Sequence, residues 1–179
     1  MNVVAARPKL TPEDLLHMKD GDRYELVDGQ LLEKFTNGWS SLIAGLLMHR
    51  LLSHSLARRL GLAGMAGQTF RCFPASPGRV RKPDVAVLRL HLLTYEQLHA
   101  SHCPIAPELV VEVLCPDDLA LVCDEQIDDY QRAGVRLIWI VNPELRTVRI
   151  HRIDGTITGL HEQDVLSGED VIVGFQVRV

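Results

Sequence analysis

Apolar runs alternate with amphipathic stretches along the chain, and this pattern predicts a mixture of strands and helices. Residues 79–88, 108–114 and 135–141 each contain a dense run of β-branched and leucine residues, which is typical of buried strands. Between the last two runs, residues 116–133 carry apolar side chains at helical spacing, with acids in the first turn that suit the helix dipole. A strand, a helix and a strand in this order predict a right-handed βαβ unit with parallel strands.

The N-terminal half of the chain predicts a second group of elements. A Thr-Pro-Glu-Asp sequence provides an N-cap and a first-turn proline for a short helix over residues 11–18. An Asp-Gly turn between two strand-like runs predicts a β-hairpin over residues 23–35. A wide apolar face predicts a long helix over residues 38–60, and residues 67–73 are expected to form a strand antiparallel to 79–88.

The C-terminal part of the chain predicts further strands. A second Asp-Gly turn joins the runs 147–153 and 156–160, and the segments 165–166 and 171–173 are expected to be short edge strands. The predicted class is therefore α/β, with a mixed β-sheet core flanked by helices and an N-terminal β-hairpin.

Composition narrows the class of protein. A chain of 179 residues, with 46% apolar and 23% charged residues, predicts one soluble domain over residues 11–179, preceded by a loose arm at residues 1–10. The net charge of −4 argues against a basic, nucleic-acid-binding coat over the whole surface, although it is compatible with a local basic patch. The four cysteines show no C-x-x-C spacing, which argues against a zinc site. No apolar run reaches the roughly 18 residues that span a bilayer, so we expect a cytoplasmic protein with reduced thiols and no membrane partner.

Two carboxylates occupy unusual places in the predicted strands. Asp84 begins an apolar run, and Glu112 lies inside another. An ionised carboxylate in such surroundings is costly unless it is paired, hydrogen-bonded or bound to a metal. Two such acids on neighbouring strands suggest a shared cation, whereas separate ion pairs with nearby arginine or lysine residues are the alternative. The spacing alone leaves both interpretations open.

Basic residues surround the approach to Asp84. Arg71, Arg79, Arg81 and Lys82 lie in or beside the predicted antiparallel strand pair. These side chains are candidates for contacts with the phosphates of a nucleic acid, because arginine offers a planar set of donors to a phosphate. They are equally typical of a solvated hairpin end.

Two further polar residues are notable for their positions. Gln126 falls on the inward stripe of the predicted helix 116–133, so its side chain needs a polar partner. Glu25 lies in the N-terminal hairpin, where most glutamates are solvated, and the pattern alone favours a surface role for it.

Five segments in a fixed order resemble a known family. They are Arg23-Tyr-Glu-Leu-Val-Asp-Gly-Gln-Leu, Arg79-Val-Arg-Lys-Pro-Asp-Val-Ala-Val, Pro107-Glu-Leu-Val-Val-Glu-Val-Leu-Cys-Pro, Tyr130-Gln-Arg-Ala-Gly-Val-Arg-Leu-Ile-Trp-Ile-Val-Asn-Pro and Gly168-Glu-Asp-Val-Ile-Val-Gly-Phe. A Pro-Asp at a strand start followed by a glutamate in a later strand resembles the core of the PD-(D/E)XK nuclease superfamily. Within that superfamily, the chain is similar to the Uma-two family of restriction-endonuclease-like proteins. Each segment is a weak signal by itself, and the ordered set is a specific one.

The resemblance implies a fold, an activity and a set of site residues. The fold would be restriction-endonuclease-like, and the activity would be hydrolysis of DNA phosphodiester bonds that depends on Mg²⁺, with Mn²⁺ as a possible substitute. Asp84 and Glu112 would bind the metal together with the backbone carbonyl of Val113, and Glu25 would take part in the site. Mg²⁺ fits such a set because it uses one or two carboxylates and keeps several waters. The resemblance also implies a homodimer.

The chain departs from the family pattern at the expected catalytic lysine. The position two residues after Glu112 is Leu114, and the helix position where the Uma-two pattern carries the lysine is Gln126. Glutamine can hydrogen-bond a water but cannot act as an acid or base. Lys82 is the lysine nearest in sequence to Asp84 that could compensate. A second hypothesis follows, in which the chain keeps the nuclease fold but acts as a nucleic-acid-binding or regulatory module.

Two further departures flank the same predicted site. Cys115 stands where the family pattern has serine, and Trp39 stands where it often has histidine. Together with Gln126, three substitutions surround one predicted site, and they count against turnover by the chain.

Overall fold

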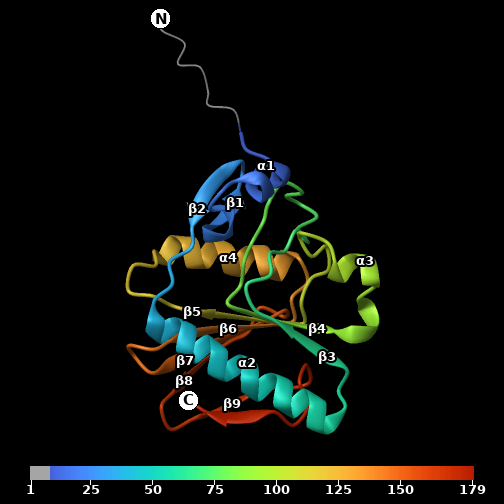
Figure 1. Ribbon diagram of the computed structural model, residues 1–179. Helices are drawn as coiled ribbons and strands as arrows, with labels where there is room; N and C mark the ends of the chain where they lie inside the picture. Colours follow the sequence, from blue (N-terminus) through green and yellow to red (C-terminus); the bar gives the residue numbers. More distant parts are fainter. Residues whose placement is uncertain (1–8) are drawn as a thin grey trace, which may run out of the picture.

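A six-stranded mixed sheet lies at the centre of the computed structural model, which describes residues 9–179 (Figure 1). In spatial order the strands are β3 (Leu62–Met65), β4 (Val85–Arg89), β5 (Leu109–Val113), β6 (Leu137–Asn142), β7 (Thr147–Arg152) and β8 (Ile157–His161). Neighbouring strands run antiparallel except β5 and β6, which are parallel. The predicted α/β class with a mixed sheet is confirmed, and the parallel pair is the one that the strand–helix–strand pattern predicted.

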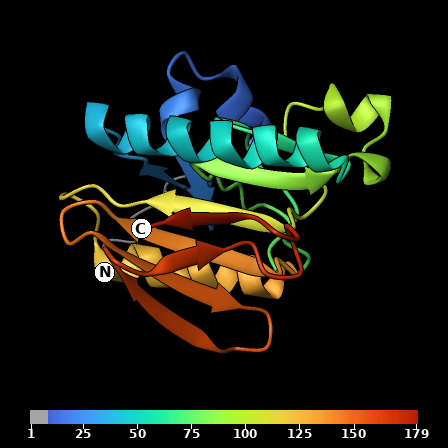
Figure 2. The same ribbon diagram turned by 90° about the horizontal axis from the view of Figure 1, so that it is seen from below.

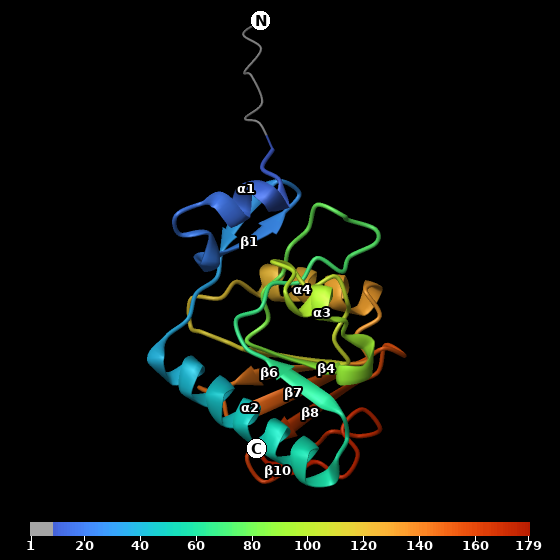
Figure 3. The same cartoon turned by 45° about the vertical axis from the view of Figure 1, so that its right-hand side comes forward.

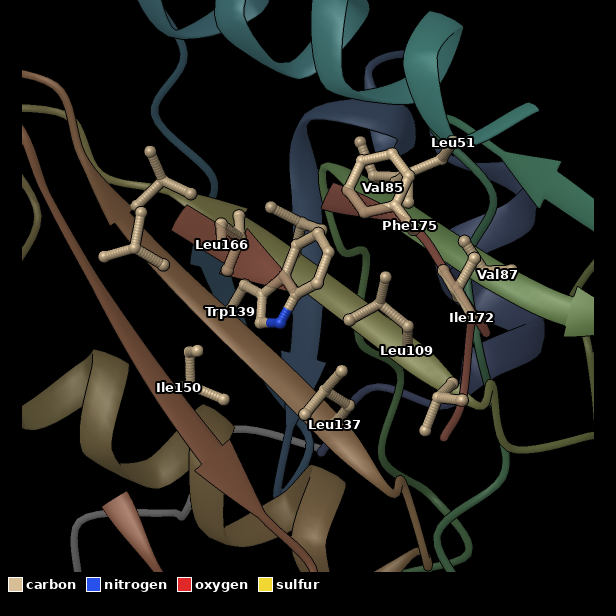
Figure 4. Packing of buried hydrophobic residues seen from close by; sticks show 14 of the residues in the cluster. Leu51, Val85, Val87, Leu109, Leu137, Trp139, Ile150, Leu166, Ile172 and Phe175 are labelled. Atoms are coloured by element: carbon tan, nitrogen blue, oxygen red, sulfur yellow. The ribbon is translucent and has the colours of Figure 1, made fainter. Parts of the chain in front are cut away.

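Two helices cover opposite faces of the sheet (Figures 1 and 2). α2 (Gly38–Arg58) packs against one face, where Leu51 joins a core that includes Trp139. The short strands β9 (Val165–Ser167) and β10 (Gln176–Arg178) pair with each other and close this face through residues such as Phe175 (Figure 4). α4 (Ala120–Arg132) covers the other face with Ile127 and Tyr130.

The N-terminal elements form a separate layer on the far side of α4 from the sheet (Figures 1 and 3). They are α1 (Pro12–His17), the 3-10 turn η1 (Gly21–Arg23), β1 (Tyr24–Val27) and β2 (Gln30–Glu33). The predicted hairpin is confirmed, since Asp28 and Gly29 adopt φ angles of 52° and 83° at its turn. An isolated bridge between Leu26 and Val80 ties the hairpin to the segment that leads into β4. Of the predicted arm at residues 1–10, only Lys9 and Leu10 lie within the described residues.

Residues 67–73 do not form the predicted strand, so this prediction is wrong. In the described chain this segment contributes only isolated bridges from Phe70 to Arg81 and Cys103, and β4 lies between β3 and β5. β3 contains Gly64, where α2 approaches so closely that an added Cβ would lie 2.5 Å from Sδ of Met48. A glycine at this position therefore allows α2 to pack closely on the sheet.

Two other predicted boundaries are shifted. α4 begins at Ala120 rather than at residue 116, because the carboxylate of Asp118 caps the backbone N–H of Cys115 in the preceding loop. Residues 171–173 form a turn, and the last strand is β10. The remaining short elements are η2 (Leu90–Leu92) and α3 (Tyr95–Leu98).

Among the described residues, no helix is long and apolar enough to span a bilayer.

Candidate active site

Asp84 and Glu112 face each other across β4 and β5. These antiparallel strands pair Val85 with Val111 and Ala86 with Val110, so Asp84, one residue before Val85, comes opposite Glu112. Side chains alternate between the two faces of a sheet, and both acids therefore share the face that carries α4. The sequence-based expectation that the two acids lie on neighbouring strands is confirmed.

Each of these carboxylates has one oxygen fixed by a neighbouring group. Oδ2 of Asp84 accepts a hydrogen bond of 2.7 Å from the backbone N–H of Val113. Oε1 of Glu112 accepts one of 2.9 Å from the hydroxyl of Tyr130 on α4. The two remaining oxygens, Oδ1 of Asp84 and Oε2 of Glu112, are left for a cation.

Lys34 supplies that cation in the structure. Its Nζ lies 2.6 Å from Oε2 of Glu112 and 3.1 Å from Oδ1 of Asp84. Burial opposes the charge of the ammonium group, but attraction to Glu112, Asp84 and Glu25 outweighs burial and raises the pKa of Lys34 above its usual range. The group is therefore a protonated counter-ion held between two acids.

The site also shifts the titration of Glu112. This residue is only 5% exposed, and burial raises its pKa to about 7, against the opposing effect of Lys34. The nearby charges of Asp84 and Glu25 act in the same direction as burial. The charged form of Glu112 therefore depends on the positive charge placed beside it, which Lys34 supplies.

The sequence analysis did not identify Lys34. It directly follows β2, and its backbone N–H donates to the carbonyl of Arg23 across the hairpin. Since Leu32 is paired with Glu25, Lys34 falls two residues further along on the same inward face. That alternation was a usable signal for an inward side chain, but only tertiary packing shows that this face lies over Asp84 and Glu112.

Glu25 is buried rather than solvated, so the surface role favoured by the hairpin pattern is wrong. It is 1% exposed, and its two oxygens accept hydrogen bonds from the backbone N–H of Lys82 and from the side chains of Arg81 and Gln126. The bond to Lys82 holds the backbone two residues before Asp84. Glu25 is thus placed to position the acidic strand rather than to ligate a metal directly.

Gln126 has the polar partner that its position on α4 required. Its Nε2 lies 3.1 Å from Oε2 of Glu25. Gln126 also lines a cavity of about 40 Å³ together with Lys34, Asp84 and Glu112. The position at which the family pattern has a lysine therefore lies at the same small cavity that the Lys34 ammonium group enters.

A larger groove of about 610 Å³ opens beside this cavity. It is bounded by the hairpin, by the N-terminal half of α2 and by the loop after β3, and Lys34 and Asp84 line both spaces. The α2 wall presents small residues, among them Ser41, Ala44 and Gly45. A substrate in this groove could therefore approach both the helix backbone and the acidic pair.

Comparison with known proteins identifies the family. A family model described as "Uma2: Putative restriction endonuclease" matches residues 12–179. The chain belongs to this family. Its fold is similar to that of a crystal structure described as "a putative nuclease belonging to DUF820 from Anabaena variabilis ATCC 29413", with a TM-score of 0.81, 17% identity and 94% of each chain covered. None of the curated proteins matches the chain. Family and fold together indicate a nuclease-type protein.

The basic residues predicted to face a phosphate have mostly different partners in this Uma2 protein. Arg81 has a fully buried side chain that pairs with Glu25 and Asp129, so its predicted contact with nucleic acid is wrong. Arg79 is largely buried and also pairs with Asp129. Buried carboxylates that would otherwise be unpaired account for both placements.

The two other predicted phosphate contacts reach the surface. Arg71 pairs with exposed Glu13 and is not among the residues that line the groove beside Asp84. Lys82 lines the groove, and its Nζ donates to the backbone carbonyl of Asp22 at 2.6 Å. Lys82 therefore does not supply the missing lysine to the acids, and Lys34 occupies that place instead.

The donor set of the Uma2 site fits a hard divalent cation that keeps most of its waters. Within residues 9–179 there is no group of three or more His, Cys, Asp or Glu side chains arranged for a metal. The two free carboxylate oxygens of Asp84 and Glu112 are nevertheless hard ligands at adjoining positions, and Mg²⁺ needs no more than one or two carboxylates from the protein. The Val113 carbonyl stays a predicted third ligand.

Proposed function

We propose that this Uma2 protein is a metal-dependent nuclease that hydrolyses DNA phosphodiester bonds, with Asp84 and Glu112 as the metal-binding acids. The observation that carries the proposal is the pair of carboxylates opposed across β4 and β5, each with one oxygen anchored and one directed at a shared cation. Mg²⁺, or Mn²⁺ in its place, would supply charge neutralisation at the phosphate and a lowered pKa for the attacking water.

The chain's own residues account for the positioning that such a reaction needs. Val113 and Tyr130 fix the orientation of the two acids through the hydrogen bonds described above. Glu25 holds the backbone at Lys82, and Gln126 donates a hydrogen bond to Glu25. Orientation of this kind reduces the reorganisation required during the reaction.

The groove beside Asp84 is the proposed path for the DNA. Lys82 and Arg23 line it and carry positive charge that phosphates would attract, with Arg23 paired to Glu33 at the same wall, whereas buried Arg81 does not reach the groove. The small side chains of the α2 wall leave room for a polynucleotide backbone. A homodimer, as implied by the family resemblance, stays a prediction, because the structure contains one chain.

A cleavage assay tests the proposed function. Purified protein is incubated with supercoiled plasmid and with single-stranded DNA, in Mg²⁺, in Mn²⁺ and in excess chelator. We expect nicked or shortened products with either metal and none with chelator. The acids alone neither neutralise the charge on the phosphate oxygens nor lower the pKa of the attacking water. Cleavage that persists in chelator at the same rate would contradict the proposed metal dependence.

A second candidate function rests on Gln126. If the helix-borne lysine of the family pattern were indispensable, this chain would be a nuclease-fold protein that binds DNA without cutting it. The assay separates the two functions when a Gln126→Lys variant is included. Cleavage by that variant alone, with DNA binding by both proteins, would identify the natural chain as a binding module; cleavage by the natural chain favours the enzyme.

A further inference from the structure

The most unusual feature of the site is that a lysine from the N-terminal hairpin occupies the place between the two acids. We propose that the Lys34 ammonium group is a built-in counter-ion that competes with the divalent cation for Asp84 and Glu112 and moves into the groove when the cation binds. This inference rests on the proposed function, because it requires a metal at the same two acids.

The hydrogen bonds around the acids make the competition direct. Oδ2 of Asp84 and Oε1 of Glu112 are occupied by Val113 and Tyr130, and the other two oxygens both contact Nζ of Lys34. A metal that uses these free oxygens therefore meets the ammonium at the same atoms. Two cations cannot share them at contact distance without strong repulsion.

The space around the site requires movement of one cation. The cavity that Lys34 lines with Asp84, Glu112 and Gln126 has a volume of about 40 Å³. While the ammonium group is in place, that space holds at most a few waters, whereas Mg²⁺ keeps several waters of its own. The cation and its waters thus need the volume that the ammonium group fills.

Lys34 has a path out of the cavity. Its side chain also lines the groove of about 610 Å³, and a lysine stem rotates about four bonds. Rotation into the groove would bring the ammonium to the wall along which the proposed DNA lies. The residue would then change from a counter-ion of the acids to a contact for a phosphate, so that metal binding and substrate contact are coupled.

Removing the ammonium group tests the competition without measuring activity. We expect Lys34→Met to bind Mn²⁺ roughly 10- to 100-fold more tightly than the natural chain, because the competing charge is gone. Binding is measured by electron paramagnetic resonance of free Mn²⁺ at slightly alkaline pH. The matched control is Lys19→Met, which removes the same charge from an exposed lysine and should leave the affinity unchanged.

The same variant should be less stable than the natural chain when no metal is present, although it binds Mn²⁺ more tightly. Without metal, Lys34→Met leaves two acids opposed with no cation between them, so its melting temperature should fall below that of the natural chain. Saturating Mn²⁺ should raise the melting temperature of the variant by more than it raises that of the natural chain. If Lys34 had only a structural role, its replacement would lower the melting temperature without raising the affinity for Mn²⁺.

A measurement on the natural chain covers the case in which Lys34→Met does not fold. The sequence has only four lysines, so the ammonium signals can be assigned by heteronuclear NMR. Titration with Mg²⁺ should shift the Lys34 signal with the same midpoint as metal binding, while the Lys19 signal stays in place.

The outcomes separate this inference from the proposed function. If the natural chain binds Mg²⁺ and Mn²⁺ but the Lys34 signal does not move, and Lys34→Met binds Mn²⁺ no more tightly, the competition is overturned and the metal site stands. If neither ion binds the natural chain or Lys34→Met, both proposals are overturned.

Discussion

Replacing Asp84 with asparagine is expected to lower metal-dependent DNA cleavage by on the order of 10³-fold, because it removes one of two charged ligands. The substitution keeps the shape of the side chain, and an asparagine oxygen can still accept the hydrogen bond from Val113. What it removes is the negative charge that faces Lys34 and the proposed metal. The loss should therefore appear in kcat and in Mn²⁺ affinity, with the fold preserved.

The matched control for this variant is Asp117→Asn. Asp117 is exposed in the loop after β5, so the same chemical change there should leave cleavage and Mn²⁺ affinity within about twofold of the natural chain, as for surface substitutions in general. Circular dichroism and the melting temperature establish that both variants are folded. Cleavage by Asp84→Asn at the natural rate would remove Asp84 from the mechanism.

Replacing Arg81 with methionine is expected to destabilise the protein by about 3–5 kcal/mol, because it leaves buried carboxylates without their charge partner. Arg81 is 0% exposed, and it donates to Glu25 and Asp129 at 2.7 Å each. Methionine fills much of the space of the side chain, so the loss reports on charge rather than on a cavity. The measurement is urea denaturation, read as the change in the free energy of unfolding.

Arg71→Met is the control for the buried pair. Arg71 also pairs with a glutamate, but both partners are substantially exposed, and such pairs contribute about 1 kcal/mol or less. A loss for Arg81→Met no larger than that for Arg71→Met would show that the buried cluster of Glu25, Arg81 and Asp129 contributes little. Because Glu25 also holds the backbone of Lys82, we expect the destabilised variant to bind Mn²⁺ more weakly as well.

The opposed acids could be predicted from the sequence because the evidence for them is local. A carboxylate inside an apolar run indicates a buried strand with a polar function, and the helix between β5 and β6 fixes their parallel direction. Adding β4 as an antiparallel neighbour places Asp84 opposite Glu112. Hydrophobic pattern and chain connectivity are sufficient for this part of the site.

Lys34 could not be predicted in the same way. Its contact with Glu112 joins residues 78 positions apart, and it depends on how the hairpin packs over α4 and the start of β4. That packing is set by buried residues such as Leu26 and Val80, which look like ordinary strand residues in the sequence. The nearness of Lys82 to Asp84 in the sequence was misleading, because the ammonium group of Lys82 is held by the backbone carbonyl of Asp22, whereas Lys34 contacts the acid.

The burial of Arg81 could not be predicted from the sequence either, because its charge suggested an exposed side chain. A cluster of arginine and lysine residues near a strand start is typical of an exposed, phosphate-facing surface, and Lys82 fits that description. Arg81, however, alternates inward and is held by Glu25 and Asp129, whose own burial depends on tertiary packing. Charge composition alone does not distinguish a basic patch from the cation of a buried ion-pair cluster.

The most direct test is a crystal structure of the natural chain soaked in Mn²⁺, with anomalous scattering to locate the ion. We predict one strong peak within about 2.2 Å of the free oxygens of Asp84 and Glu112, a distance typical of small hard cations, with Lys34 turned into the groove. Lys34 still bridging both acids at saturating Mn²⁺, with no anomalous peak beside them, would contradict the account.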